Sequence, residues 1–230
     1  MNQNNDIILR CHGITTCYTG CSEHAVLREV DISVEKGEIV GILGPNGSGK
    51  SSTLNSVMGH LRILCGEVYF GSEKVSGLHP EDVARKGVRL FPQGGRVFPD
   101  LTVEENLQVA ASCVPRRHAV KKEKVFEWFP DLAPRKRTRA GLLSGGQKQL
   151  LSLGMVLLYM QVPESTVFLL DEPSGSLDPQ NRNRLAEVLL EARDQYGASI
   201  LIAEENAVFA KHVCSRFYRF VEPGQLEPFV

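Results

Sequence analysis

The sequence predicts an α/β fold in which a core with a mostly parallel sheet carries a small antiparallel β subdomain and an inserted helical subdomain. Nearly continuous apolar runs of strand length occur at residues 38–43, 167–170 and 200–203. Such runs are typical of parallel strands that are buried on both faces. A glycine-rich loop follows the first run and acidic residues follow the other two, with helical segments between them. Strands that alternate with helices in this way indicate an α/β core.

Two segments near the N-terminus predict the antiparallel unit. Residues 7–9 and 26–34 have the character of short strands, and Lys36-Gly37 has the chemistry of a turn after the second. Residues 51–61, which follow the glycine-rich loop, have helical character. We therefore expect the parallel core to begin with a strand, a loop and a helix.

The helical insertion is predicted between these core segments, because residues from about 95 to 160 have mostly helical character. Capping boxes at residues 102–105 and 144–147 mark two helix starts inside it. Asp178-Pro179 marks a third helix start, with proline at the first helical position. We predict one domain over residues 1–230, with a core of residues 1–94 and 161–230 and a helical subdomain at about 95–160.

The composition is that of an ordinary globular chain, with 42% hydrophobic and 23% charged residues. Its formal net charge of −1 gives no global attraction to nucleic acid, so we expect no nucleic-acid partner. Basic stretches at residues 116–122 and 135–139 fit solvated surface. The polar start lacks the order of a secretion signal, and the apolar stretch around 150–160 is shorter than the ~20 residues that span a bilayer. We therefore expect a cytoplasmic chain whose contact with a membrane comes through a partner.

Cysteine and histidine residues cluster near the N-terminus without a metal-binding spacing. They are Cys11, His12, Cys17, Cys21 and His24. None of the six cysteines of the chain forms a Cys-x-x-Cys pair, and the spacing matches no closed zinc pattern. Reduced thiols are the expected state.

A phosphate-binding loop follows the first apolar run. Residues 44–51 satisfy the pattern G-x-x-x-x-G-K-S, in which backbone N–H groups and a helix N-terminus surround phosphate oxygens. Lys50 is expected to reach the β- and γ-phosphates, and the Ser51 hydroxyl to bind Mg²⁺. The pattern predicts a P-loop NTPase core that binds ATP through Gly44, Pro45, Asn46, Gly47, Ser48, Gly49, Lys50, Ser51 and Ser52.

The second apolar run delivers two carboxylates to this site. Residues 167–170 end at Asp171, which we predict in the magnesium shell, and at Glu172, which we predict beside the attacking water. A carboxylate there can orient water and accept its proton, while metal and Lys50 offset the charge of the phosphates.

Residues 143–147, Leu-Ser-Gly-Gly-Gln, resemble the signature motif of ABC (ATP-binding cassette) ATPases. A serine hydroxyl and free N–H groups at a helix start form an anion site. The resemblance implies that this site faces the γ-phosphate held by a second ATPase subunit, so that ATP lies between two subunits in a head-to-tail dimer. The nucleotide-binding residues that it implies are Ser144, Gly145, Gly146 and Gln147.

The same resemblance assigns roles to three further residues. Tyr18 has the position of an aromatic residue that stacks on adenine, and Gln93 that of a glutamine that contacts magnesium and couples the site to transport. Asp178, in the segment 174–178, has the position of an aspartate near the dimer interface. The similarity extends from about residue 7 to residue 224.

Glu205 departs from the family pattern, because it has the position of a histidine that usually contacts the γ-phosphate. A carboxylate there repels phosphate unless it is protonated, turned away, or bridged by metal or water. We expect partial burial of Glu205 to favour the protonated form. Glu205 is therefore a candidate catalytic residue and a possible cause of slow hydrolysis. Residues 154–157 also depart from the usual sequence of the signature helix, and we have no physical account of that departure.

Residues 94–107 resemble the shorter ATPase subunit of branched-chain amino acid importers, a branch in which Glu-Gln-Asn often replaces the histidine region, compared with Glu-Glu-Asn at 204–206. The resemblance implies two permease chains, a second ATPase, an external solute-binding protein, and a peripheral location on the inner face of the cell membrane. A soluble ABC ATPase without a permease is an alternative, although such proteins usually carry long coiled-coil insertions or tandem cassettes. A hydrolysis-impaired regulatory subunit, suggested by Glu205, is another.

Overall fold

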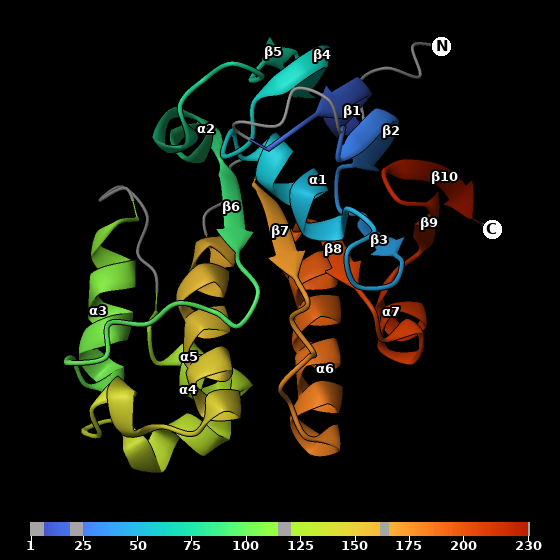
Figure 1. The fold of residues 1–230 in the computed structure, drawn as a ribbon. Coiled ribbons are helices and arrows are strands. Elements are labelled where there is room, and N and C mark those ends of the chain that lie inside the picture. Colours follow the sequence, from blue (N-terminus) through green and yellow to red (C-terminus); the bar gives the residue numbers. More distant parts are fainter. Residues whose placement is uncertain (1–6, 19–24, 115–120, 162–165, 230) are drawn as a thin grey trace.

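The computed structural model describes residues 7–18, 25–114, 121–161 and 166–229, and its strands form two sheets (Figure 1). The larger sheet has six strands in the order β10-β9-β3-β8-β7-β6. All neighbouring pairs in it are parallel except β9 and β10, which are antiparallel. This confirms the prediction of a mostly parallel core sheet. The strands are β3 (Ile39–Leu43), β6 (Val88–Phe91), β7 (Val167–Asp171), β8 (Ser199–Glu204), β9 (Arg216–Glu222) and β10 (Gln225–Phe229).

The smaller sheet is antiparallel and has the order β2-β1-β4-β5. It contains both strands expected near the N-terminus, and β1 continues to Thr16 instead of ending near residue 9. β4 and β5 were not predicted. The strands are β1 (Ile7–Thr16), β2 (Leu27–Glu35), β4 (Ile63–Phe70) and β5 (Glu73–Lys74).

Four helices belong to the core segments of the chain. Between β3 and β4, α1 ends at Val57 and not near residue 61, because Gly59 just beyond it has a φ of 83° and cannot continue the helix. Asp178 caps α6 as its sequence predicts, by accepting a hydrogen bond from the amide of Asn181. The four are α1 (Lys50–Val57), α2 (Pro80–Lys86), α6 (Pro179–Tyr196) and α7 (Ala207–Val213).

The described residues between 95 and 160 contain helices and no strand. In Figure 1 they stand together beside β6, away from the four-stranded sheet. Both predicted capping boxes are present, one at Thr102 and one at Ser144. The elements are α3 (Val103–Ser112), α4 (Lys124–Trp128), α5 (Gly145–Leu157) and 3₁₀ turns at Pro130–Arg135, Ala140–Leu142 and Leu158–Gln161.

Two apolar clusters cover the two faces of the parallel sheet. Phe168 and Leu170 of β7 pack with the helices of residues 103–160, whereas Val167 and Leu169 pack with α1 and the antiparallel sheet. Alternate residues of one strand thus lie in different clusters, so β7 is buried on both faces, as its apolar run predicts. The carboxyl ends of β3, β7 and β8 consequently lie side by side at one edge, where polar residues follow each strand. Among the described residues no helix is both long and apolar enough to cross a bilayer.

Candidate functional site

The glycine-rich loop joins the end of β3 to the start of α1. Lys50 is buried, and its Nζ donates to the carbonyls of Gly44 at 2.8 Å and Pro45 at 3.1 Å. These two hydrogen bonds hold the loop around the lysine side chain. Gly49 has a φ of 121°, and a Cβ there would lie 2.9 Å from Leu27 Cδ2. Only glycine meets both demands without strain. The loop therefore holds the first amides of α1 in one fixed arrangement that suits an anion.

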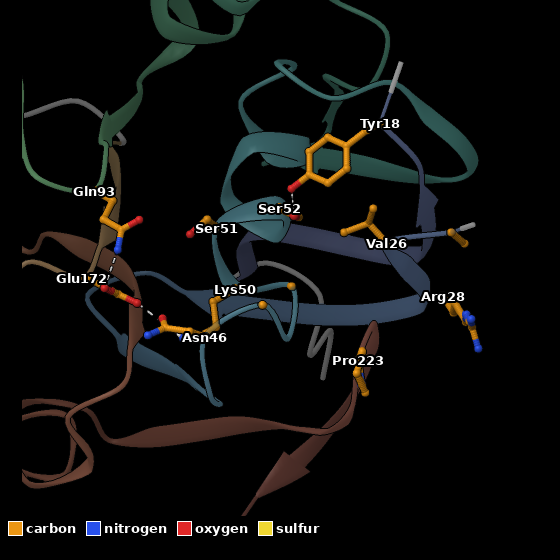
Figure 2. Close-up of a pocket in the computed structure, with 13 residues that line it drawn as sticks. Tyr18, Val26, Arg28, Asn46, Lys50, Ser51, Ser52, Gln93, Glu172 and Pro223 are labelled. Carbon is orange, nitrogen blue, oxygen red and sulfur yellow. Dashed lines mark hydrogen bonds and ion pairs between the residues drawn. The ribbon is translucent and has the colours of Figure 1, made fainter. Parts of the chain in front are cut away.

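A cavity of about 690 Å³ opens beside this loop, and Figure 2 shows the side chains that line it. Its volume lies in the ordinary range for small-molecule sites. Lys50, Gln93 and Glu172 lie at one end and Arg28 and Pro223 at the other. The lining residues are Tyr18, Ala25, Val26, Arg28, Asn46, Gly47, Gly49, Lys50, Ser51, Ser52, Gln93, Glu172 and Pro223.

Two of the three predicted magnesium ligands, Ser51 and Asp171, come from distant parts of the chain and lie next to each other. Ser51 Oγ donates to Asp171 Oδ1 at 3.0 Å. Burial raises the pKa of the Asp171 carboxyl and the nearby charge of Glu172 adds to the rise, while the Ser51 hydrogen bond and Lys50 oppose it. Hydroxyl and carboxylate oxygens are ligands that Mg²⁺ prefers, so the donor set fits this ion. A bound cation would favour the ionised carboxylate.

Glu172 lies between the lysine and the glutamine that the sequence singles out. Its Oε1 is 3.5 Å from Lys50 Nζ, and its Oε2 accepts a hydrogen bond from Gln93 Nε2 at 2.7 Å. The residue has a φ of 48°, which is uncommon for a side chain of this kind. Strained backbone of this type is often found at functional sites. The geometry holds a carboxylate at the end of the cavity where the phosphate loop begins.

Tyr18 lines the cavity, and the residue is 53% exposed. Its hydroxyl and that of Ser52, in the first turn of α1, are 3.0 Å apart and share a hydrogen bond (Figure 2). The bond ties the hydroxyl end of the ring to α1, while the residue stays more than half exposed. This arrangement is compatible with the expected stacking on adenine.

The structure shows how Glu205 differs from its neighbour Glu204. Glu205 is exposed, so the partial burial that we expected for it is wrong, and its Oε2 accepts a hydrogen bond from Asn46 Nδ2 of the phosphate loop at 3.1 Å. Glu204 is the buried carboxyl, and Ser174 Oγ lies 2.8 and 3.0 Å from its two oxygens. Burial raises the pKa of Glu204 to about 7, and the Ser174 hydrogen bond opposes the rise.

The signature residues 144–147 and Asp178 do not line the cavity. Ser144 and Gly145 are exposed at the start of α5, and Ser144 Oγ accepts from the amide of Gln147 at 3.3 Å. Asp178 is exposed, and the hydrogen bond from the amide of Asn181 holds its pKa below the usual range. The chain thus brings the loop, Asp171, Glu172, Gln93 and Tyr18 together, and it presents the signature on another surface.

Sequence reasoning missed several residues of the cavity wall. Val26 directly precedes β2 and Arg28 lies at its start, and Pro223 lies in the turn between β9 and β10. Backbone bonds join these segments, because the amide of Arg28 donates to the carbonyl of Gly224 and the amide of Gly224 to that of Ser48. No local pattern in the sequence marks them, since tertiary contacts alone bring them to the loop.

Part of the N-terminal cysteine and histidine cluster, Cys21 and His24, lies outside the described residues, as do Arg116, Arg117 and His118 of the first basic stretch. Within the ranges that the structure describes, no group of three or more His, Cys, Asp or Glu residues has the arrangement of a metal site.

Residues 27–175 match the ABC transporter family. The probable branched-chain amino acid transport ATP-binding protein LivF of Archaeoglobus fulgidus is 33% identical, over 88% of this chain and 84% of its own length. The high-affinity branched-chain amino acid transport ATP-binding protein BraG of Pseudomonas aeruginosa is 37% identical, over 87% and 84%. The lipopolysaccharide export system ATP-binding protein LptB of Haemophilus influenzae is 29% identical, over 84% and 79%. A solved structure of an ATP-binding subunit of an ABC transporter has a TM-score of 0.80 at 25% identity, and the match covers 96% of this chain and 90% of that one.

Proposed function

The chain belongs to the ABC transporter family and is an ATPase subunit of such a transporter, and we propose that it powers the import of branched-chain amino acids or related solutes. The observation that carries this proposal is the identity of 33% and 37% to two branched-chain amino acid transport subunits. An export subunit is similar at the lower identity of 29%. The likeness of residues 94–107 to the shorter ATPase of such importers supports the same choice.

ATP occupies the cavity beside the phosphate loop in this proposal. The adenine stacks on the exposed face of Tyr18, and the amides of residues 46–52 hold the phosphates. Lys50 exchanges its bonds to the carbonyls of Gly44 and Pro45 for bonds to the β- and γ-phosphates. The buried ammonium thereby gains anionic partners without leaving its position.

Hydrolysis uses Glu172 as the base. Its carboxylate orients a water molecule against the γ-phosphate and accepts a proton from it as the new oxygen–phosphorus bond forms. The bond between the γ-phosphorus and the bridging oxygen of the β-phosphate breaks in the same step, and ADP leaves with that oxygen. Gln93 keeps the carboxylate in place through its hydrogen bond, and Lys50 stabilises the charge that develops on the phosphate. Mg²⁺, held by Ser51, Asp171 and Gln93 when bound, offsets further phosphate charge.

The proposed assembly contains a second ATPase subunit, two membrane permease chains and an external solute-binding protein. The exposed signature at the start of α5 supports the head-to-tail dimer, because this anion site lies outside the cavity of its own subunit. Attachment to permeases puts the chain on the inner face of the cell membrane. A regulatory subunit with slow turnover stays a second candidate, because the exposed carboxylate of Glu205 is bound to the phosphate loop through Asn46.

Copurification of the native complex tests the transport proposal. The tagged chain should bring down permease subunits, and the complex in proteoliposomes should take up labelled leucine, isoleucine or valine when ATP and the solute-binding protein are present. A Glu172→Gln complex serves as the control without turnover. Recovery of a complex without any membrane-spanning chain would instead favour a soluble ABC ATPase. Outward movement of a lipid or lipoprotein would contradict the import of amino acids.

A further inference from the structure

Gln149 is a buried polar residue that reaches from the helix of the signature motif to the backbone of the proposed catalytic base. It is 1% exposed and lies in the second turn of α5. Its Nε2 donates to the carbonyl of Pro173 at 2.6 Å and to that of Glu172 at 3.3 Å. The side chain therefore ties α5 to the loop that follows β7.

The backbone that receives these bonds is in an uncommon conformation. Glu172 is one of two non-glycine residues in the described ranges with a positive φ, and its value of 48° is disfavoured by the contact of Cβ with its own backbone. Such a conformation persists only where the surroundings hold it. The amide of Glu172 donates to the carbonyl of Ala203 in β8 at 2.8 Å. Gln149 of α5 donates to the carbonyl of Glu172 itself, so hydrogen bonds hold the peptide groups on both sides of its Cα.

Stability alone does not explain an amide at this position. Gln149 Oε1 is buried and has no hydrogen-bond partner among the described residues. A buried acceptor without a partner destabilises a protein, and an apolar side chain of similar size would avoid that cost. An apolar side chain would, however, remove the donor from the carbonyl of Pro173 and leave that of Glu172 with the amide of Gly175 alone. The two carbonyl bonds are thus the reason for the glutamine.

The start of the same helix lies against the same loop. A Cβ at Gly146 would be only 3.1 Å from the carbonyl oxygen of Ser176, so the first turn of α5 touches the segment after Glu172 directly. This turn begins at Ser144, the first residue of the anion site in the signature motif. A shift of the signature end of α5 therefore acts on residues 172–176 through both Gly146 and Gln149.

We infer that Gln149 is a positioning residue for ATP hydrolysis, which fixes the backbone of Glu172 so that its carboxylate stays against Gln93 and Lys50. The inference rests on the proposed role of Glu172 as the base and on the proposed dimer. In that dimer the signature of this subunit contacts the ATP of its partner. Gln149 then makes the position of the base in one site depend on the contact of the signature with the other.

The test replaces Gln149 by methionine, which has the same length and no donor. In the copurified complex, kcat of Gln149→Met should fall at least tenfold, while the Kd for ATP from calorimetry changes less than threefold. Gln149→Glu keeps the shape and loses the amide donor, and it should give the same result. Leu151→Val is the matched control, because it also changes a buried residue of α5 but on the opposite side of the helix. It should lower the denaturation midpoint and leave kcat near the wild-type value.

A double variant separates positioning from a structural role. In the Glu172→Gln background, single-turnover hydrolysis should fall less than twofold when Gln149→Met is added, because the group that Gln149 positions is already absent. A full tenfold loss in that background, a wild-type kcat for Gln149→Met, or failure of both Gln149 variants to fold would overturn the inference. Wild-type turnover of Glu172→Gln alone would instead overturn the proposed base.

Discussion

Lys50 is buried inside the phosphate loop, where its ammonium contacts two carbonyls and lies 3.5 Å from a carboxylate of Glu172. Burying an ammonium is costly unless it has anionic or carbonyl partners. The loop therefore keeps a cation ready at the place where the phosphate-loop motif expects the β- and γ-phosphates. The same motif predicted this place from eight consecutive residues, because the loop forms within one short segment of chain.

Removal of the ammonium should weaken the binding of ATP. We expect Lys50→Ala to raise the Kd for ATP at least tenfold in a calorimetric titration, since the phosphates lose a charge-assisted contact. Lys36→Ala, which removes an exposed lysine from the turn after β2, is the control and should bind ATP like the wild type. An unchanged Kd for Lys50→Ala would contradict the assignment of the phosphate loop.

Glu205 should not support hydrolysis through its charge. In the structure the carboxylate accepts from Asn46 Nδ2 at 3.1 Å, and Asn206 caps α7 with its own side chain. Bound ATP brings negative charge to this strand end, so an ionised Glu205 opposes it. We expect Glu205→His to keep or raise steady-state turnover at neutral pH, because an imidazole N–H can donate to a phosphate oxygen.

Glu205→Gln is the matched control, since it removes the charge and keeps an oxygen that can accept from Asn46. Turnover that rises in both variants indicates repulsion by the carboxylate, and turnover that stays unchanged in both indicates that Glu205 points away from the phosphate. If Glu205→His abolished hydrolysis and ATP still bound, Glu205 would have a positive catalytic role and the prediction would be wrong.

Some of the strands could be predicted from the sequence and others could not. β3, β7 and β8 were predicted because parallel strands buried on both faces are apolar throughout. β1 was predicted too short, because Arg10, His12 and Gly13 interrupt its apolar residues and its pairing with β2 is irregular at that point. β4 was missed, because Gly66 and Glu67 interrupt its apolar residues and leave no continuous run. Backbone pairing with β1 forms this strand, and the pattern of its side chains does not predict it.

The candidate site likewise contains residues that the sequence could predict and contacts that it could not. The loop, the signature and the Asp-Glu pair are each a continuous motif, whereas the contact of Gln149 with the loop after β7 joins two elements and has no local pattern. Tertiary contacts also decide which of the two adjacent glutamates near the end of β8 is buried. Residues 204 and 205 are both glutamate, and only the packing of β8 against Ser174 makes Glu204 the buried one.

Burial of Glu204 at the end of β8 should make stability fall as pH rises. The carboxyl loses its proton near pH 4.5 in the unfolded chain, whereas its pKa is about 7 in the folded protein. Between these values the folded state keeps a proton that the unfolded state has released, so stability decreases through this window and the loss is complete above it. The loss amounts to about 3 kcal/mol on the scale of 1.4 kcal/mol per tenfold change in the equilibrium constant.

Glu204→Gln should therefore show a smaller decrease in unfolding free energy between pH 5 and pH 8 than the wild type does. Urea unfolding at several pH values between these limits measures the difference, and other titrating groups cancel in the comparison. Glu222→Gln, an exposed glutamate of β9, is the control and should follow the wild-type profile. An identical pH dependence for Glu204→Gln and the wild type would show that Glu204 is ionised in the folded protein throughout this range.

At the scale of the whole molecule, the two anion sites of the chain lie on different surfaces. The phosphate loop and Glu172 line the cavity, whereas the start of α5 with the signature is exposed and does not line it. In the proposed dimer, a single chain offers one part of each of two nucleotide sites, and the second ATPase subunit supplies the missing part. ATP itself then becomes a component of the interface, and hydrolysis removes the group that both subunits contact.

A variant that binds ATP but cannot hydrolyse it should accumulate as the closed dimer. We expect Glu172→Gln to keep ATP binding and to lose at least a hundredfold in turnover, because the amide preserves the shape of the side chain and cannot accept the proton of water. Light scattering with ATP should give twice the mass of the subunit, and ADP should return it to the single mass. The measurement is made with and without the copurified second ATPase, since the native pair can contain two different chains.

The Lys50→Ala and Glu172→Gln double variant is the control and should stay monomeric, because without bound ATP nothing joins the phosphate loop of one subunit to the signature of the other. A single-subunit mass for Glu172→Gln at saturating ATP, with the partner ATPase present, would contradict the proposal that these two surfaces close on one nucleotide.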